Sequence, residues 1–263
     1  MSDEEIGKHL KLFFGHRPPD FGIWKGFQFC RQFAETHDYA LPSDGALDQV
    51  GDDRLSEYHS LFLLKRTLGQ FANKRAVMTL CQHRRFVLNT PVGAPSVNQP
   101  FSRAVSKEVA KGLDTDLLFP LKGAFLLGTP FVMTVSVLQQ YKSHHPLRDL
   151  LRFTAQMIDA EILSEQESED FLLSSSFIPA PSCGTFTVDS MIEILDTLER
   201  SFLAYLGGGY LEREGYQRRA FSFLLERLNS FLLINYLKKR NIDPARHYGY
   251  TTTVSDNDVI KPG

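Results

Sequence analysis

The sequence predicts an α/β fold in a single domain, with a strand-rich first half (about residues 1–137), a helical second half (about 138–240) and a polar tail (241–263). Short apolar runs alternate with helical periodicity in the first half, and long amphipathic segments fill the second. Length agrees with this architecture, because 263 residues supply the core of one large α/β domain or of two small ones.

Composition and charge exclude several classes of protein. Hydrophobic residues make up 43% of the chain and charged residues 23%, which is ordinary for a globular domain and argues against disorder, collagen-like repeats and coiled coil. Lys and Arg (29) nearly balance Asp and Glu (31), so the formal net charge of -2 argues against a protein that coats nucleic acid. A local basic site is compatible with that average.

The cysteines and the N-terminus favour a cytoplasmic protein. Cys30, Cys81 and Cys183 show no CxxC spacing, which argues against a disulfide scaffold or a zinc knuckle and favours a reducing compartment. The acidic run 3–5 has the wrong charge for a signal peptide, and no stretch is apolar for long enough to predict a transmembrane segment.

The first half contains the predicted strands. Residues 10–14 (LKLFF) form an apolar run that ends before Gly15, and the two prolines at 18–19 forbid regular structure there. Residues 75–80 (RAVMTL) predict a buried strand. A further strand is expected to end at 117–119, and the stretch 125–137 is apolar and rich in β-branched residues.

Helical periodicity begins at residue 56 and dominates the second half. Tyr58, Leu61 and Phe62 start an apolar stripe that continues to Gly69, a plausible stop. The further helices expected are 139–145, 147–163, one that starts with a capping-box pattern at Ser164–Glu167, 190–206 with Asp189 as its cap, and 219–240.

Basic residues follow two of the predicted strands. His16-Arg17 come directly after the first strand, and Gln82-His83-Arg84-Arg85 come after the strand at 75–80. Cations at strand ends are well placed to meet a phosphate, and the planar arginine fork suits a diphosphate. Neighbouring side chains of extended chain point in different directions, so at most one of Arg84 and Arg85 faces a given ligand. Exposed basic turns are the alternative interpretation.

Two patterns of potential metal ligands suggest a metal site. Asp114-Thr115-Asp116 match the DxD pattern with which nucleotide-sugar transferases hold a divalent cation, since paired carboxylates suit Mg²⁺ or Mn²⁺. The more ordinary interpretation is that Asp114 caps a turn and Asp116 begins a strand. His144-His145 with Asp149 form a second pattern, without a partner at zinc-like spacing.

The last predicted helix carries charges among apolar residues. Arg219 and Glu226 are seven residues apart and therefore share one face, with Arg227 nearby. Charges on a buried helix are costly unless they are paired, so they either pair with each other or face a polar cavity.

Several well-known signatures are absent from the sequence: GxGxxG, GxxxxGK[ST], GxSxG and HExxH. Rossmann redox enzymes, P-loop proteins, α/β-hydrolases and zincins therefore lack support.

Taken in order, the motifs resemble those of a bacterial family of capsular and surface polysaccharide glycosyltransferases, some of them described as galactofuranosyltransferases. The family's strand ending in His-Lys is matched by Gly15-His16-Arg17, and its helix starting in Ser/Cys-Glu by Ser56-Glu57. Its double-arginine motif is similar to Thr79–Phe86, where Gln82 replaces a histidine. In the middle of the chain, the family's Gln-Tyr, histidine and Asp-Leu correspond to Gln140-Tyr141, His144 or His145, and Asp149-Leu150. Its Met-Phe-Ile strand corresponds to Thr185–Val188. Its closing motif, Arg-x-x-Gly-Phe-Leu-x-Glu-Arg-Leu, corresponds to Arg219–Leu228.

The resemblance implies a GT-A-like nucleotide-binding fold and a glycosyltransferase acting in polysaccharide synthesis. Such an enzyme moves a sugar, hexosyl or galactofuranosyl, from a nucleotide-sugar donor (a UDP-sugar is expected) to a glycan or lipid-linked glycan acceptor. It also implies a cytoplasmic location, with the periphery of the inner membrane as one option.

Glycosyl transfer develops positive charge on the sugar and negative charge on the departing diphosphate, so the site needs cations and a carboxylate base. The residues expected to serve are His16, Arg17, His83, Arg84, Arg85 and Arg219 at the donor diphosphate; Glu226 or Asp189 as the base; His145, Asp149, Glu57 and Arg227 at the acceptor or in support; and Asp114 and Asp116 where Mg²⁺ or Mn²⁺ serves instead.

Two other functions stay open at this point. Gln82 in place of the family's histidine suggests a non-catalytic nucleotide- or glycan-binding scaffold with the same fold. Asp114 and Asp116 suggest a Mg²⁺-dependent phosphotransferase, which would turn over nucleotide without a sugar acceptor.

Overall fold

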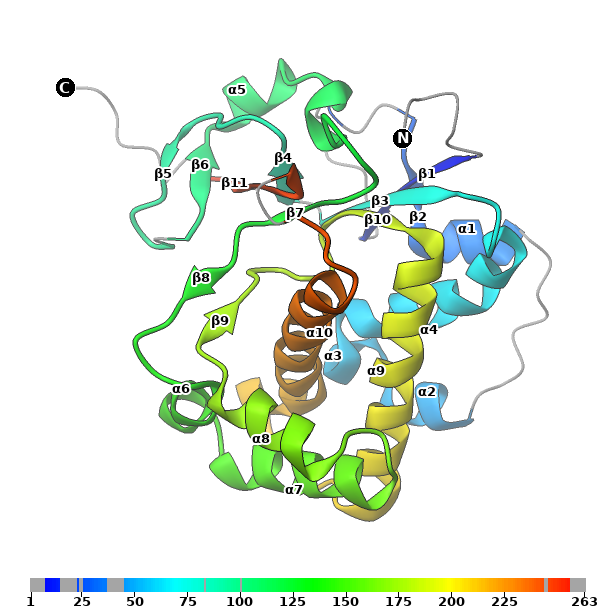
Figure 1. Cartoon of the computed structure of the whole chain (residues 1–263), viewed down its shortest axis with the longest axis vertical. Coiled ribbons are helices and arrows are strands. Elements are labelled where there is room, and N and C mark those ends of the chain that lie inside the picture. The colour runs from blue at the N-terminus through cyan, green and yellow to red at the C-terminus, as the bar shows by residue number, and fades with distance from the viewer. Residues whose placement is uncertain are drawn as a thin grey trace.

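The computed structural model (Figure 1) describes residues 8–14, 23, 26–36, 45–82, 84–99, 101–243 and 246–255, except for the side chains at 48, 49 and 52. The sheet lies at one end of the molecule, and the long helices α9 (Val188–Gly208) and α10 (Ala220–Lys239) extend from it into a helical region. The predicted α/β, GT-A-like fold with a helical C-terminal half is confirmed.

Within the described residues, a mixed sheet of nine strands has the order β2-β1-β3-β10-β7-β11-β6-β5, and β4 pairs with β11. β1 (His9–Phe14) runs parallel to β2 (Gln28–Phe29) on one side and to β3 (Val77–Gln82) on the other. β10 (Gly184–Thr187) lies antiparallel between β3 and β7 (Leu126–Gly128). β10 thus joins the parallel N-terminal strands to the rest of the sheet.

β1 and β3 confirm the two strands that the sequence predicts most clearly. All of β3 except Gln82 is buried, as expected for an apolar run covered on both faces of a sheet. The register pairs Phe14 with Gln82, so both strands end at the same edge. Ligands of α/β proteins bind outside the carboxyl ends of such strands.

The C-terminal segment, predicted as a polar tail, contributes β11 (Tyr248–Val254) to the sheet. It runs parallel to β7 and to β6 (Arg103–Val105) and antiparallel to β4 (Arg85–Leu88). The strand fits tightly, since a Cβ at Gly249 would collide with a backbone carbonyl of β4. Its β-branched threonines favour extended chain, but only the surrounding strands show that they are buried. β5 (Ala94–Pro95) completes this side of the sheet.

Short helices connect the strands of the first half. They are α1 (Cys30–Thr36), α2 (Gly45–Val50), α3 (Asp52–Leu55), α4 (Glu57–Leu68), the 3-10 helix η3 (Gly69–Phe71), α5 (Lys107–Lys111) and the 3-10 helix η4 (Thr115–Leu118). The second half adds β8 (Phe131–Val132) and β9 (Ser176–Phe177), which pair with each other, α6 (Val137–His144), α7 (Leu147–Asp159), α8 (Glu165–Leu173) and the 3-10 helix η5 (Gly215–Arg219).

Helix starts agree with the sequence in one place and differ in another. Ser164 and Glu167 form the predicted capping box of α8. Asp189, however, is not the cap of α9: the Thr187 hydroxyl accepts the Ser190 N–H, and Asp189 lies in the first turn and accepts the Asn73 N–H at 2.8 Å. Thr187 is two residues nearer the sheet, and there the backbone is still extended as a cap requires.

The strand expected to end at 117–119 is wrong. Residues 115–118 form η4, because Asp114 accepts the Asp116 N–H at 3.0 Å and turns the chain. Leu118 is buried as the apolar run suggests, but its burial comes from a single turn. A short apolar run does not distinguish a strand from one helical turn by periodicity alone.

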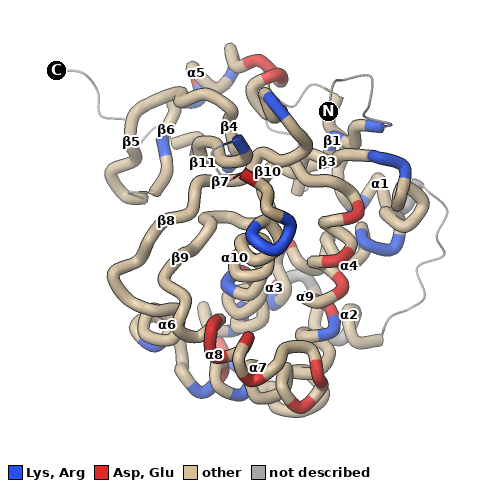
Figure 2. Tube along the Cα trace, in the orientation of Figure 1, with Lys and Arg blue, Asp and Glu red and all other residues tan. Residues whose placement is uncertain are grey.

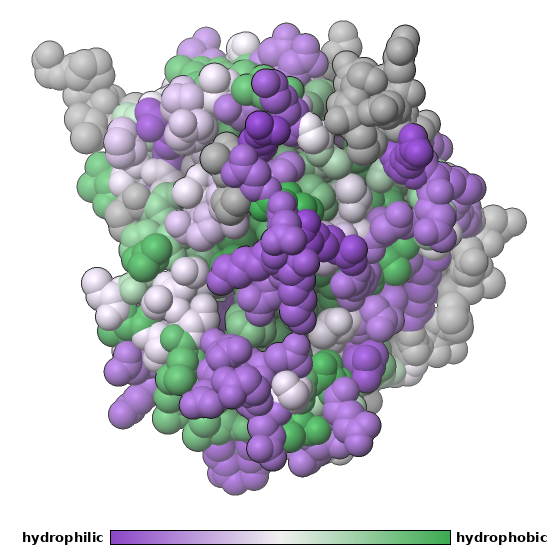
Figure 3. Space-filling view, viewed as in Figure 1, coloured by the Kyte–Doolittle hydropathy of each residue, from purple (hydrophilic) through white to green (hydrophobic). Residues whose placement is uncertain are grey.

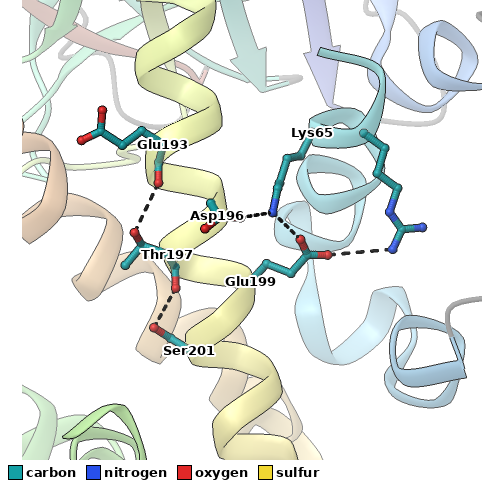
Figure 4. Close-up of polar contacts among 7 residues, drawn as sticks. Lys65, Glu193, Asp196, Thr197, Glu199 and Ser201 are labelled. Atoms are coloured by element: carbon teal, nitrogen blue, oxygen red, sulfur yellow. Dashed lines mark hydrogen bonds and ion pairs between the residues drawn. The ribbon is translucent and has the colours of Figure 1, made fainter. Parts of the chain in front are cut away.

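Helices α4 and α9 pack through aromatic side chains and a set of ion pairs. Phe62 stacks on Phe202 with ring centroids 5.8 Å apart. Beside them Lys65 donates to Asp196 at 2.7 Å and to Glu199 at 2.8 Å (Figure 4), a group called the α4–α9 ion-pair cluster below. Burial alone would lower the pKa of Lys65, but these two hydrogen bonds raise it above its usual value. The cluster is therefore a structural contact that favours the charged form of Lys65.

Charge on the helical surface follows the helix dipoles. Lys238 and Lys239 lie in the last turn of α10, where basic residues are visible in Figure 2, and Lys239 pairs with Glu167 in the first turn of α8 at 3.3 Å. Cations at a carboxyl end and carboxylates at an amino end are both favourable. The same face carries hydrophilic residues interspersed with hydrophobic ones (Figure 3), as is ordinary for protein surfaces.

Candidate active site

A cleft of about 890 Å³ opens at the edge where β1 and β3 end. Phe13 and Phe14 of β1, Phe29 of β2 and Gln82 of β3 form its sheet side. The first turn of α4, helix α10 and the preceding η5 form its helix side. The size is within the range of small-molecule sites.

The start of α4 is turned into the cleft by an unusual backbone. Ser56, between α3 and α4, has φ 55° and ψ -132°, which is uncommon for a residue with a side chain. This sharp junction brings Ser56, Glu57, Tyr58, His59 and Ser60 to the cleft wall. Strained backbone of this kind is often kept at functional sites.

Glu57 holds the most perturbed carboxyl group of the cleft. It accepts a hydrogen bond from Gln82 Nε2 at 2.5 Å and another from the hydroxyl of Ser182. Burial raises the pKa of Glu57 to about 7; the Ser182 bond and the charges of Arg85 and Arg219 oppose this shift, and the charge of Glu226 adds to it. Glu57 can therefore take up or release a proton near neutral pH.

Glu226 of α10 is the second carboxylate of the described cleft lining. It is half-buried, and no described residue forms a hydrogen bond or ion pair with its carboxylate. A half-buried carboxylate without a partner is costly unless a ligand completes it. Glu226 is thus available to a substrate.

Arg85 and Arg219 bring positive charge to the cleft. The buried Nε of Arg85 has no hydrogen-bond partner within the described residues, and its Nη2 reaches Gln99 only at 3.4 Å. Arg219 is exposed, donates to Ser56 Oγ at 3.1 Å and lies over the Phe223 ring at 5.6 Å. Arginine donors left free in a cleft suit a phosphate or diphosphate.

The structure therefore brings together Glu57, Gln82, Arg85, Arg219 and Glu226, which the sequence places on three separate segments. The neighbouring Arg84 is exposed and is not among the cleft residues, as expected for adjacent side chains in extended chain.

Three predicted acceptor or supporting residues are not themselves part of the cleft lining and have structural partners. Arg227 is buried and joins α10 to α6 by donating to Gln140 Oε1 at 2.7 and 3.0 Å. Asp149 is fully buried and pairs with Arg213 at 2.6 Å. His145 stacks on Phe223, with ring centroids 4.2 Å apart.

The acidic patterns do not reach the cleft either. Asp114, the cap of η4, and Asp116 within it are exposed and are not cleft residues, and Asp189 accepts a hydrogen bond from Asn73 instead. His144 contacts the Gln140 carbonyl and His145 contacts Gln217, so neither joins Asp149 in a ligand set. In the part of the chain that the structure describes, no three His, Cys, Asp or Glu residues form a metal-binding group.

His16, Arg17 and His83 lie outside the described residues, so their predicted contact with a diphosphate stays a prediction.

Sequence reasoning missed several residues in the cleft lining or in contact with it. Ser182 precedes β10 and reaches Glu57 across the sheet edge, and Tyr216 and Phe223 line the helix side. Gly184 signals the tight entry into β10, since its φ of 137° and the nearby Leu126 carbonyl leave no room for a side chain. The sequence gives no local signal for Tyr216, which precedes a helix without belonging to its apolar stripe.

Comparisons with known proteins bear on the fold. No family model matches the sequence, and no curated protein matches it either. The structure is similar to a solved structure of WbbM, a bifunctional glycosyltransferase in its apo form, with a TM-score of 0.65 and 12% sequence identity. The match covers 97% of this chain and 47% of WbbM, so this chain spans about half the length of that protein. A likeness at this identity shows a shared fold.

Among the described residues, no helix is long and apolar enough to cross a membrane.

Proposed function

We propose that this protein is a glycosyltransferase that moves a sugar from a nucleotide-sugar donor to a glycan acceptor in polysaccharide synthesis. The observation that carries the proposal is the cleft at the ends of β1 and β3, where Arg85 Nε and the carboxylate of Glu226 have no hydrogen-bond partner among the described residues. Its fold is shared with one half of a bifunctional glycosyltransferase, which supports the same class of reaction.

The donor fits the sheet side of the cleft. A nucleotide bound outside the carboxyl ends of parallel strands would place its base against Phe13, Phe14 and Phe29. Arg85 and Arg219 would then neutralise the diphosphate, with His16, Arg17 and His83 as further candidates from the sequence. A UDP-sugar and a hexosyl or galactofuranosyl group are the donor features that the sequence resemblance favours.

Glu226 is the proposed base. As the acceptor hydroxyl oxygen forms its bond to the anomeric carbon, the bond from that carbon to the diphosphate breaks, and the diphosphate leaves with the electron pair. Glu226 accepts the hydroxyl proton, and the arginines stabilise the negative charge on the leaving group. Glu57, bound to Gln82 and Ser182, shapes this site beside Glu226.

The test is transfer activity of Glu226→Gln with a panel of UDP-, GDP- and dTDP-sugars and glycan acceptors. The amide cannot accept the proton, so transfer should fall by about 10²–10⁴-fold while nucleotide binding by calorimetry is kept. Glu193→Gln, on the exposed part of α9 and paired with Arg240, is the matched control. Full activity of Glu226→Gln would overturn the assignment of the base.

A non-catalytic scaffold is the second candidate, favoured by Gln82, which replaces a histidine of the resembling family and holds Glu57. This alternative predicts that the protein binds nucleotide or glycan without turnover of any donor. Absence of binding to UDP, GDP and dTDP would contradict the transferase.

A further inference from the structure

Four aromatic side chains form a continuous stack at the helix side of the cleft. Tyr141 of α6 lies 4.8 Å from His145, His145 lies 4.2 Å from Phe223 of α10, and Phe223 lies 5.0 Å from Tyr216 of η5, measured between ring centroids. His145 and Phe223 are nearly parallel, at 23°. The stack begins in the core and ends at the surface.

The inner end of this stack is fixed by other contacts. Tyr141 is fully buried, and the Arg227 guanidinium lies over its ring at 5.0 Å. His145 contacts Gln217 at 3.1 Å, and Gln217 donates to the His144 carbonyl at 3.1 Å, which ties η5 to the end of α6. Burial lowers the pKa of His145 to about 4, against the opposing effect of the Gln217 bond, so its ring is neutral at physiological pH.

The outer end of the stack is open. Tyr216 is 66% exposed and lines the cleft together with Phe223. The residue before it, Gly215, has φ 57°, and a Cβ added there would meet no atom within 4 Å, so this turn projects into open space. An aromatic ring that packed neighbours hold in place, and that is exposed at the rim of a cleft, is typical of a binding surface.

The surroundings indicate which ligand this ring suits. Arg219 and Glu226 lie on the same wall of the cleft and offer hydrogen-bonding groups beside an aromatic face. A sugar ring is complementary to this surface. Its apolar C–H face suits the negative face of an aromatic ring, and the hydroxyls around its edge suit the polar groups. A charged or purely apolar ligand would use only half of these contacts.

We infer that Tyr216, supported by Phe223 and His145, is a stacking platform for a sugar ring of the acceptor glycan. This inference rests on the proposed function and adds where the acceptor binds. The sugar's hydroxyl edge then faces Glu226, the proposed base, on the neighbouring part of α10.

A nucleobase is the other flat ligand that could stack on Tyr216. The sheet side of the cleft, lined by the half-buried Phe29 and the buried Phe13 and Phe14, lies at the strand ends, where nucleotides of α/β proteins bind. The helix side is therefore left to the acceptor.

The test compares Tyr216→Ala, Tyr216→Phe and the control Tyr250→Ala, which removes an exposed tyrosine on β11 away from the cleft residues. The probes are the methyl glycosides of galactose, glucose and mannose, whose binding is followed by saturation-transfer NMR. Tyr216→Ala should bind the preferred glycoside about fivefold to tenfold more weakly. Tyr216→Phe and Tyr250→Ala should bind it as the wild type does.

Calorimetry with UDP, GDP and dTDP on the same variants separates the possible failures. Unchanged nucleotide binding in Tyr216→Ala, together with weakened glycoside binding, supports the platform. Lost nucleotide binding with unchanged glycoside binding assigns the ring to the nucleobase and overturns the inference. Binding of no glycoside by the wild type also overturns it, whereas an active Glu226→Gln contradicts the proposed base and leaves the platform in place.

Discussion

Two groups of charged residues in this protein differ in how they are satisfied. In the α4–α9 ion-pair cluster each charge faces an opposite one, with Lys65 bound to Asp196 and Glu199. In the cleft, Glu226 has no partner among the described residues, and Arg85 keeps a buried nitrogen unpaired. The fold thus pairs the charges between α4 and α9 but leaves charged groups of the cleft unpaired. Unpaired charged groups in a cleft indicate a binding site.

After Glu226→Gln, the largest effect is expected from Arg85→Ala. If the unpaired guanidinium serves the leaving diphosphate, transfer should fall by about 10²–10³-fold, because a charge-stabilising donor is lost. Stability should hardly change, since the only hydrogen bond from the Arg85 side chain to a described residue is the long one to Gln99 at 3.4 Å. Kinetics and thermal unfolding measure the two effects. Arg84→Ala, the exposed neighbour, is the control and should stay active; equal losses in both variants would contradict a specific role for Arg85.

The second prediction concerns Glu57 and pH. Because the folded protein raises the pKa of Glu57 from 4.5 to about 7, the folded state keeps a proton that the unfolded state releases. The stability that this proton contributes is complete below about pH 4.5 and is lost as pH rises to about 7. Glu57→Gln has no carboxyl group to lose this proton. Between pH 5 and pH 8 its free energy of unfolding should therefore rise, relative to that of the wild type, by on the order of 2 kcal/mol.

Urea unfolding of both proteins at pH 5 and pH 8 measures this difference. The wild type should lose more free energy of unfolding between the two pH values than the variant does. Glu165→Gln, an exposed carboxylate in the first turn of α8, is the control and should follow the wild type. Parallel pH dependences of wild type and Glu57→Gln would contradict a buried, protonated Glu57.

The third prediction concerns the satisfied cluster. Lys65→Ala leaves Asp196 without its cation and Glu199 with only the longer contact to Arg66 at 3.9 Å, and should destabilise the fold by about 1 kcal/mol. The loss should shrink in high salt, and transfer activity should be unchanged because the cluster is not part of the cleft lining. A large loss of activity at full stability would remove the distinction between the two groups of charges.

The smallest effect is expected from Asp114→Asn. Asparagine can cap η4 as aspartate does, so stability should stay within about 0.5 kcal/mol. Activity should be unchanged with and without added Mg²⁺ or Mn²⁺, since Asp114 is not among the cleft residues. A metal-dependent loss of activity would instead support Asp114 and Asp116 as ligands of a divalent cation.

Part of the site could be predicted from the sequence because its residues follow local patterns. Arg85 stands at the end of an apolar run, and Arg219 and Glu226 share a helix face, so each could be named before the fold was known. The same patterns also selected Asp114 and Asp189, which the fold uses in local turns and contacts at other places. Residue type and spacing thus identify candidate site residues but do not distinguish those that line the cleft from those that do not.

The sequence by itself determined the elements that an apolar run or a long apolar segment marks: β1, β3, α4, α9 and α10. Only the tertiary structure decided that β11 enters the sheet, that Ser182 reaches Glu57, and that Tyr216 ends a stack from the core. The physical reason is that periodicity records which face of one element is buried, whereas strand pairing, charge pairing and exposure depend on residues far apart in the chain.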